Sequence, residues 1–324
     1  MRSTAILRKK RLALTTRELD FFNASSVQLE PSGQRLFLSP SDAGPHAIRD
    51  KHLAFSDEDL SALGWAEGAV VEKTIEDGRV MVEQIAEPLD QALNGQDEHG
   101  VPIPPGWLTQ TVVNNSDALA FAKSGEHVGR FFADLFVQHA GGAERLLDFG
   151  CGCGRLARVL PRMLGCSVSG CDLQTAAVEW CRRNLEGDFR QGVEWPPMEW
   201  PDGAFDSLTA VSVLTHLDED HQFKWLEEWR RLVAPGGVLL VTFRSDRYIA
   251  KAEKDAAKAD ALRSKGFIYQ NLGFWEGIFP QFYGGTYHTD DYIRENWGRY
   301  FDVHEIISCG TGPMIQDLAV MKRR

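Results

Sequence analysis

The stretch from Arg145 to Leu156 constrains the fold of this chain more than any other. It begins with a short apolar run that carries Asp148, and it continues into glycines at alternate positions, Gly150, Gly152 and Gly154. Apolar residues then recur at helical spacing. A strand, a glycine turn and a helix predict the first βα unit of a nucleotide-binding α/β sheet. The glycines permit a tight turn, and their missing side chains let a ligand lie against the backbone.

The spacing of these glycines narrows the choice of ligand. The dinucleotide fingerprint requires a glycine three residues after Gly152, and Arg155 stands there. A phosphate-binding P-loop requires Gly-Lys-Ser/Thr at its end, which this stretch lacks. The pattern present is acid-x-Gly-x-Gly-x-Gly. It resembles motif I of the class I S-adenosylmethionine-dependent methyltransferases.

Later segments support this resemblance in order. Residues 166–172 predict a second strand that ends in Asp172, about 20 residues after the glycine turn. An acid at this point of a βαβ nucleotide fold accepts hydrogen bonds from both ribose hydroxyls. In the same family an acid after the third strand often contacts the adenine amino group, and Glu194 lies at the matching distance before the turn at 201–206.

The fourth and fifth strands follow. Residues 207–214 are rich in β-forming residues and lead into Thr215 and His216. A helix from about 220 to 233 is expected to end at Ala-Pro-Gly-Gly, because proline cannot continue a helix. Residues 238–243 predict a buried central strand. The phrase from 232 to 242 is similar to the region before strand five in these enzymes.

The resemblance covers roughly residues 105 to 324. It is strongest to a bacterial subgroup whose three motifs fall here at 148–155, 212–217 and 316–320, with Leu214 in place of the usual Phe. The resemblance implies an α/β, Rossmann-like, doubly wound sheet of seven strands with one antiparallel edge. It also implies S-adenosylmethionine as the cofactor.

The resemblance also implies which residues hold the cofactor. Asp148 is expected to orient the glycine loop and the methionine amine rather than to transfer a proton. The other members lie in the glycine turn or just beyond the next three strands. The implied set is Asp148, Gly150, Cys151, Gly152, Gly154, Asp172, Leu173, Glu194, Trp195 and Ser212.

The chemistry follows from the cofactor. A sulfonium carries an activated methyl group, so the enzyme mainly aligns an acceptor oxygen, nitrogen or carbon with it. A general base is optional when the acceptor is nitrogen. In this fold the end of strand four faces the methyl group, which places Ser212, Thr215 and His216 nearest the reaction. His216 is the first candidate for acceptor contact or base, and His288 is the second; for either, the alternative is a hydrogen-bonded structural histidine.

Other signals limit the function. Acids at 218–220 suit the first turn of a helix, and we predict no metal. The Asp/Asn-Pro-Pro-Tyr/Phe motif of amide and nucleobase methyltransferases is missing after strand four. The net charge of −11 argues against a nucleic-acid partner, which requires a basic face. The basic start, residues 1–11, lacks the apolar core of a signal peptide, and no apolar run is long enough to span a membrane.

The six cysteines form no Cys-x-x-Cys pair and are expected to be small buried residues in a reducing compartment. A cytoplasmic protein is the simplest interpretation. Its length of 324 residues favours about two domains. Turn-forming residues at 94–106 mark the boundary between an N-terminal α+β accessory region, 1–105, and the methyltransferase domain, 106–324.

The accessory region includes a hairpin, 70–75 with 79–85, around an Asp-Gly turn. It could shape the acceptor site, mediate a homodimer or buttress the fold. In the second domain we expect Ser124-Gly125 to divide the helical region 116–136 into two helices. The insertion 245–295 combines a polar helix, 250–265, with an aromatic-rich segment that suits either an acceptor pocket or ordinary packing.

The sequence therefore predicts a methyltransferase that modifies oxygen or nitrogen of a small-molecule or glycan acceptor. A protein or nucleic-acid methyltransferase, or a non-catalytic S-adenosylmethionine-binding module, is the alternative. Arg155 speaks against a nicotinamide-dependent oxidoreductase. The sequence does not specify the acceptor, the methylated atom or the oligomeric state.

Overall fold

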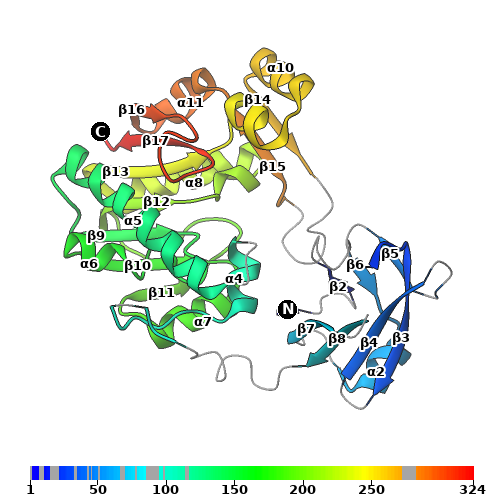
Figure 1. Cartoon of the computed structure of the whole chain (residues 1–324). Helices are drawn as coiled ribbons and strands as arrows, with labels where there is room; N and C mark the ends of the chain where they lie inside the picture. The colour runs from blue at the N-terminus through cyan, green and yellow to red at the C-terminus, as the bar shows by residue number, and fades with distance from the viewer. Residues whose placement is uncertain are drawn as a thin grey trace. The chain divides into compact units, whose positions relative to one another are not determined.

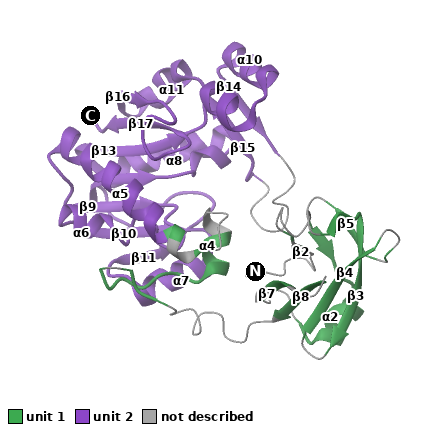
Figure 2. Ribbon diagram, viewed as in Figure 1, with its two compact units in different colours: residues 1–121 green, residues 122–324 purple. Residues whose placement is uncertain are grey.

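A computed structural model of the chain divides into two compact units, residues 1–121 and 122–324 (Figures 1 and 2). The structure describes residues 2–6, 11–14, 22–32, 35–41, 44, 46–49, 52–65, 70–76, 79–84, 95–97, 99–113, 117–271 and 282–324. The boundary that we expect after residue 105 stays a prediction. Among the described residues, no helix combines the length and the apolar character needed to cross a bilayer.

An eight-stranded sheet forms most of the first unit, and every neighbouring pair is antiparallel. Its order across the sheet is β1 (Arg2–Ile6), β7 (Val70–Glu76), β8 (Arg79–Gln84), β4 (Arg35–Ser41), β3 (Ser26–Ser32), β5 (His46–Arg49), β6 (His52–Ala54) and β2 (Arg11–Ala13). The pairing of β7 with β8 confirms the predicted hairpin, while the turn residues 77–78 lie outside the described part of the chain.

The described part of this unit also contains the helices α2 (Asp57–Leu63) and α4 (Gly106–Val113). Ser56 caps α2 because its Oγ accepts a hydrogen bond from the Asp59 amide, and the Asp59 side chain accepts one from the Ser56 amide in return. Gly64 then ends the helix in the left-handed conformation. Leu60 and Leu63 of α2 belong to the buried core of this unit.

A seven-stranded mixed sheet organises the second unit. Its order is β11 (Asp188–Gln191), β10 (Ser167–Asp172), β9 (Arg145–Phe149), β12 (Phe205–Ala210), β13 (Val233–Phe243), β17 (Asp317–Lys322) and β16 (Asp302–Ile307). The first five strands are parallel, and β17 runs antiparallel to both of its neighbours. This confirms the α/β Rossmann-like fold. The antiparallel strand is β17 rather than the edge strand β16, which corrects our expectation.

Strand order reverses between β9 and β12, so the crevice at their carboxyl ends is the topological switch point where such sheets bind ligands. The helices of this unit surround the sheet (Figure 1). Helix α7 packs against β10 and β11, and α8 packs against β13. The helices are α5 (Ala118–Ala140), α6 (Leu160–Leu164), α7 (Thr175–Asn184), α8 (Glu219–Leu232), α9 (Asp246–Tyr248), α10 (Ala256–Lys265) and α11 (Asp290–Asn296).

Helix α5 is continuous, so the break that we expect at Ser124-Gly125 is wrong. A Cβ at Gly125 would lie 2.7 Å from the Arg155 carbonyl oxygen, and one at Gly129 would press on Val159. These glycines therefore allow α5 to approach the segment that follows the glycine loop, which requires small residues rather than a flexible joint. That segment, 155–159, forms turns, and α6 starts only at residue 160.

Aromatic rings fill the core between the sheet and its helices. Phe149 of β9 lies 4.7 Å from Trp225 and 5.1 Å from Trp229, both of α8, between ring centroids. Phe243 of β13 contacts Trp297, which lies in the 3-10 turn Trp297–Arg299. Each such ring removes roughly 150–250 Å² from water, so these contacts dominate the hydrophobic stabilisation of the sheet.

The insertion between β13 and β16 contains α9, the π-turn Ile249–Glu253, α10, the paired strands β14 (Phe267–Gln270) and β15 (Gly285–His288), and α11. The single polar helix expected at 250–265 is wrong, because Lys254 adopts the left-handed conformation and Asp255 caps a new helix. Part of the aromatic segment, residues 272–281, lies outside the described residues.

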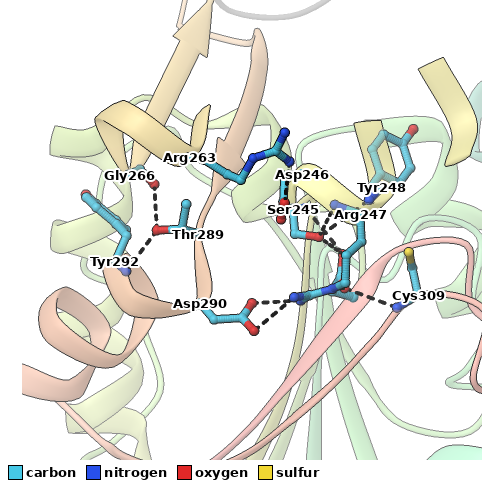
Figure 3. A network of polar contacts seen from close by, with 11 residues as sticks. Ser245, Asp246, Arg247, Tyr248, Arg263, Gly266, Thr289, Asp290, Tyr292 and Cys309 are labelled. Atoms are coloured by element: carbon cyan, nitrogen blue, oxygen red, sulfur yellow. Dashed lines mark hydrogen bonds and ion pairs between the residues drawn. The ribbon is translucent and has the colours of Figure 1, made fainter. Parts of the chain in front are cut away.

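One group of polar contacts ties the insertion to the sheet (Figure 3). Arg247 Nε donates to the Asp317 carboxylate at 2.9 Å, and both Arg247 Nη atoms donate to Asp290 at 2.7 and 3.0 Å. Ser245 Oγ donates to the same Asp317 carboxylate at 2.7 Å. This Arg247 network joins the end of β13, the start of α11 and the start of β17. Asp317 is fully buried, so its charge depends on these donors.

We expect Asp317→Ala to lower the free energy of unfolding by about 3 kcal/mol, since it leaves the Arg247 guanidinium without its buried partner. Asp302→Ala is the matched control, because Asp302 pairs with Arg324 on the exposed surface and its loss costs about 0–1 kcal/mol. Urea unfolding followed by circular dichroism measures both values. Equal losses for the two variants would contradict the role given to the network.

Candidate functional site

The glycine loop sits at the carboxyl end of β9. Gly150, Gly152 and Gly154 have φ values of +73°, +52° and +80°, a region that residues other than glycine rarely adopt. A Cβ on Gly150 would collide with Val213 Cγ2, and one on Gly154 would collide with Leu185 Cδ1. Glycine is therefore required at Gly150 and Gly154 both by the backbone conformation and by the neighbouring side chains.

Asp172 holds this loop against the end of β10. One carboxylate oxygen accepts a hydrogen bond from the Gly152 amide at 2.8 Å, and the other accepts from the Gln174 amide at 2.8 Å. Burial raises the pKa of Asp172, and these two backbone hydrogen bonds oppose that rise by stabilising the charged form. The structure thus brings the predicted ribose ligand and the glycine loop together.

Asp148 is the second buried acid of the site. Thr209 Oγ1 of β12 donates to its carboxylate at 2.8 Å. Burial raises the pKa of Asp148 to about 6, against the opposing effects of the Thr209 hydrogen bond and the charge of Arg155. Asp148 joins β9 to β12 directly beneath the switch point, as the register pairing of Asp148 with Thr209 shows.

The loop after β12 carries a strained residue. Ser212 has φ +60°, and its amide donates to Thr242 Oγ1 at 2.7 Å. A non-glycine residue in this region costs about 1–3 kcal/mol, and such strain persists where the surroundings enforce it, often at functional sites. The next residue, Val213, is the one that closes over Gly150. The loops after β9 and β12 therefore pack directly on each other.

His216 lies in the same loop, in the 3-10 turn Leu214–His216. Its Nδ1 lies 2.8 Å from the Gly284 carbonyl oxygen, and its ring stacks on Tyr283 with centroids 4.3 Å apart. Nδ1 must donate to that carbonyl, which makes Nε2 the acceptor nitrogen. Burial, followed by the charge of Arg244, lowers the pKa of His216 to about 3, so the imidazole is neutral at physiological pH.

His288, the second candidate, occupies a different environment. It is fully buried in β15, with Nε2 2.9 Å from Gln222 Oε1, and its ring contacts Phe243 and Trp297. Burial lowers the pKa of His288 to about 3. Full burial keeps this ring away from solvent and favours the alternative of a structural histidine, so a catalytic role for His288 stays a prediction.

The remaining predicted cofactor residues surround the loop after β11. Glu194 is exposed, and Trp195 is half-exposed and stacks on His221 with centroids 3.6 Å apart. The Leu173 carbonyl accepts from Gln191 Nε2 at 3.0 Å. Glu194 and Trp195 therefore lie at the surface after β11, and no hydrogen bond joins Glu194 to Asp172 among the described residues.

The cysteines behave as small apolar residues, as predicted. All six are free, and five are buried: Cys151, Cys153, Cys166, Cys171 and Cys181. Burial raises the pKa of the Cys153 thiol, and a hydrogen bond with Cys181 together with burial raises that of Cys151. The thiols of Cys151 and Cys153 therefore stay protonated and contribute packing around the loop.

Sequence reasoning missed His221 and Arg244, which the structure places around this loop system, and it included Tyr283 only as part of the aromatic-rich segment of the insertion. His221 is sandwiched between Trp195 and Phe282, and its Nδ1 lies 2.7 Å from an Asp218 oxygen. Tyr283 stacks on His216, and Arg244 lies beside His216. The position of Arg244 directly after the fifth strand was the one available signal, since ligand-binding residues gather at carboxyl ends of strands.

We expect Gly150→Ala to destabilise the protein more than Gly165→Ala. Both glycines have similar positive φ values, +73° and +68°, but nothing lies within 4 Å of a Cβ at Gly165. Gly165→Ala should cost about 1 kcal/mol for the backbone alone, and Gly150→Ala a further 1–3 kcal/mol or so for overpacking. Adding Val213→Ala should recover part of that second loss in urea unfolding. Equal losses of unfolding free energy in the two glycine variants would show that the Val213 side chain moves aside without a penalty.

The pKa of Asp148 predicts a pH effect on stability. Its pKa is higher in the folded protein, about 6, than its ordinary value of 3.8, so the folded state binds the proton more tightly. Its contribution to stability is greatest below pH 4 and is lost as pH rises to 6. Asp148→Asn cannot titrate and so lacks this loss. The unfolding free energy of the variant, relative to that of the wild type, should therefore rise by about 3 kcal/mol from pH 4 to pH 7. Parallel stability curves over that range would contradict the raised pKa.

Comparisons with known proteins agree with this geometry. The model of a methyltransferase domain matches residues 146–237. Ribosomal protein L11 methyltransferase of Ralstonia pickettii is 31% identical over 112 residues, which cover 35% of this chain and 36% of that protein. Ubiquinone biosynthesis O-methyltransferase of Caulobacter sp. is 32% identical over 143 residues, which cover 43% of this chain and 55% of that protein. The chain thus spans between about a third and just over half the length of these relatives.

Among solved structures, the N-methyltransferase NodS from Bradyrhizobium japonicum in complex with S-adenosyl-L-homocysteine is 14% identical, with a TM-score of 0.44 over 67% of this chain and 98% of that one. The family match spans β9 to the start of β13, the part of the sheet that carries the glycine loop, Asp172 and the strained turn. Over residues 146–237 the chain is therefore similar to a methyltransferase domain, and its curated relatives are methyltransferases.

Proposed function

We propose that this protein transfers a methyl group from S-adenosylmethionine to oxygen or nitrogen of a small-molecule or glycan acceptor by in-line displacement. The observation that carries the proposal is the clamp at the switch point. Asp172 binds the Gly152 amide and the Gln174 amide, next to a loop in which Gly150 admits no side chain. A carboxylate and a bare backbone at this edge of a parallel sheet suit a nucleoside ligand.

The residues present fit the cofactor. Each Asp172 oxygen accepts one backbone hydrogen bond and has a further lone-pair direction, which is what the two hydroxyls of a ribose require. The glycine loop, residues 150–154, provides backbone without side chains for the methionine portion. Asp148, mostly ionised at pH 7 with a pKa of about 6, provides a negative charge for the methionine ammonium. Glu194 and Trp195 complete the set on the adenine side.

Bound S-adenosylmethionine supplies an electrophilic methyl group on a sulfonium. The chain's own residues then have to place an acceptor in line with it. The loop after β12, with the strained Ser212 and with His216, is positioned for this because it packs directly on the glycine loop. With a pKa of about 3, His216 is a weak base, so we assign it a hydrogen bond to the acceptor rather than removal of its proton.

A protein acceptor is the second candidate, favoured by the name of the relative from Ralstonia pickettii, a ribosomal protein L11 methyltransferase. The acidic net charge of −11 does suit a basic protein substrate. The small-molecule reading rests on the relative named for ubiquinone biosynthesis and on the aromatic surroundings of His216. Homodimer formation through the N-terminal unit stays a prediction.

Calorimetric titration tests the cofactor site first. We expect S-adenosylmethionine and S-adenosylhomocysteine to bind the wild type with micromolar affinity and NAD to show no binding. Asp172→Ala should weaken the binding of S-adenosylmethionine and of S-adenosylhomocysteine by roughly 100-fold, because it removes a charge-assisted pair of hydrogen bonds. Asp188→Asn is the matched control, since that exposed acid on β11 pairs with Arg190 and should leave binding unchanged.

Two outcomes would count against this function. A wild type that binds neither sulfur ligand is not a methyltransferase. Equal affinities of the wild type and a folded Asp172→Ala variant would show that the nucleoside lies elsewhere. Where binding is established, transfer of a labelled methyl group to a panel of hydroxyl and amine acceptors, with ribosomal protein fractions beside them, separates the two acceptor classes.

A further inference from the structure

Arg244 is the first residue after β13, and its guanidinium lies where three segments meet. Its Nη1 is 3.4 Å from the Thr215 carbonyl oxygen, and its Nη2 is 3.5 Å from His216 Nε2. The guanidinium carbon lies 5.6 Å from the ring centre of Tyr248 and 5.8 Å from that of Tyr287. Two aromatic rings and the loop after β12 therefore surround a permanently charged side chain.

The nearby carboxylates are already paired with other cations. Asp246 binds Arg263 at 2.8 Å, Asp290 and Asp317 bind Arg247, and Glu253 binds Lys258 at 2.8 Å. These acids come from the segments that flank Arg244, namely α9, the π-turn, α11 and β17. Figure 3 shows Arg247 directed toward Asp290, whereas Arg244, three residues earlier, has no carboxylate partner among the described residues.

No ion pair joins Arg244 to a carboxylate among the residues that the structure describes. Its Nε is buried and has no hydrogen-bond partner within the same part of the chain, and the two contacts of its Nη atoms are at the long limit of hydrogen bonding. A guanidinium has five N–H donors, and leaving them poorly matched beside aromatic rings costs free energy. An oxyanion would match the planar fork of this group with two short hydrogen bonds.

Arg244 belongs to the same edge of the sheet as the cofactor loop. His216 connects them, since it contacts Arg244 on one side and stacks on Tyr283 on the other. Asp172 raises the pKa of Tyr283 and Arg244 lowers it, after the larger effect of burial, so both charges lie within electrostatic reach of that hydroxyl. Val213, three residues before His216, closes over Gly150. An anion on Arg244 would therefore lie on the β12–β13 side of the nucleoside site.

We propose that Arg244 binds an oxyanion, a carboxylate or a phosphate group, of the methyl acceptor and thereby sets which end of the acceptor faces the loop after β12. This inference rests on the proposed function and narrows its substrate class to anionic acceptors. Tyr248 and Tyr287 limit the approach to the guanidinium, so its free N–H edge selects a flat or tetrahedral oxygen group over a bulky cation.

The test uses the full chain saturated with S-adenosylhomocysteine and three probes of similar size: benzoate, phenyl phosphate and neutral benzamide. We expect calorimetry to show tighter binding of at least one anion than of benzamide. Arg244→Gln should weaken anion binding by roughly tenfold or more and leave benzamide unchanged, because the charged hydrogen bonds are lost. Arg244→Lys should give an intermediate affinity, since it keeps the charge without the fork. Arg230→Gln, on the exposed surface of α8, is the control.

The outcomes separate the two proposals. Benzoate and phenyl phosphate that bind the wild type no better than benzamide, or that bind Arg244→Gln as tightly as the wild type, overturn the role of Arg244. A preference between the two anions identifies carboxylate or phosphate as the recognised group. S-adenosylhomocysteine is also titrated into the wild type and into each variant. If it does not bind the wild type, the methyltransferase function is wrong. If it binds Arg244→Gln as tightly as the wild type, the variant is folded and only the anion site has changed.

Discussion

The hydrogen bond from the Gly152 amide to the Asp172 carboxylate joins the loop after β9 to the end of β10, beside the switch point between β9 and β12. A loop with three left-handed glycines has no regular secondary structure to hold it. Asp172 supplies that restraint from β10, and Val213 supplies it from the loop after β12. Because the loop is held from both sides, its glycine backbone keeps one conformation at this edge of the sheet.

The charged side chains at this edge of the sheet differ in whether they have a partner. Asp148 and Asp172 are both desolvated, yet each keeps a donor, Thr209 for one and backbone amides for the other. Arg244 and Arg247 are three residues apart, and only Arg247 has carboxylate partners in the described structure. The Arg247 network fixes the start of the insertion, and this fixes the position of Arg244 beside His216. A structural ion pair thus positions a cation that is suited to a ligand.

Local signals located the glycine loop and its neighbouring acid correctly in the fold. The acid and the glycines of motif I, and the acid that ends the second strand, lie within a short piece of chain whose βα geometry is set by sterics and hydrogen bonding. Gly125 shows the limit of such signals. Glycine within a helix indicates either a break or a close approach, and only the position of the Arg155 carbonyl shows that it is the second. The same holds for His288, whose sealed position depends on Gln222, 66 residues away in the sequence.

By itself the sequence determined the class of sheet, the glycine loop proposed to hold the cofactor and the acid at the end of the second strand, because these features depend on neighbouring residues and on the allowed conformations of glycine. The tertiary structure alone decided the strand order in space, the continuity of α5, the neutral state of His216 and the isolation of Arg244 from the nearby acids. Each of these depends on desolvation and on contacts between segments far apart in the chain. Burial shifts a pKa and pairing removes a charge only after distant segments have packed together, and no local pattern of residues encodes that.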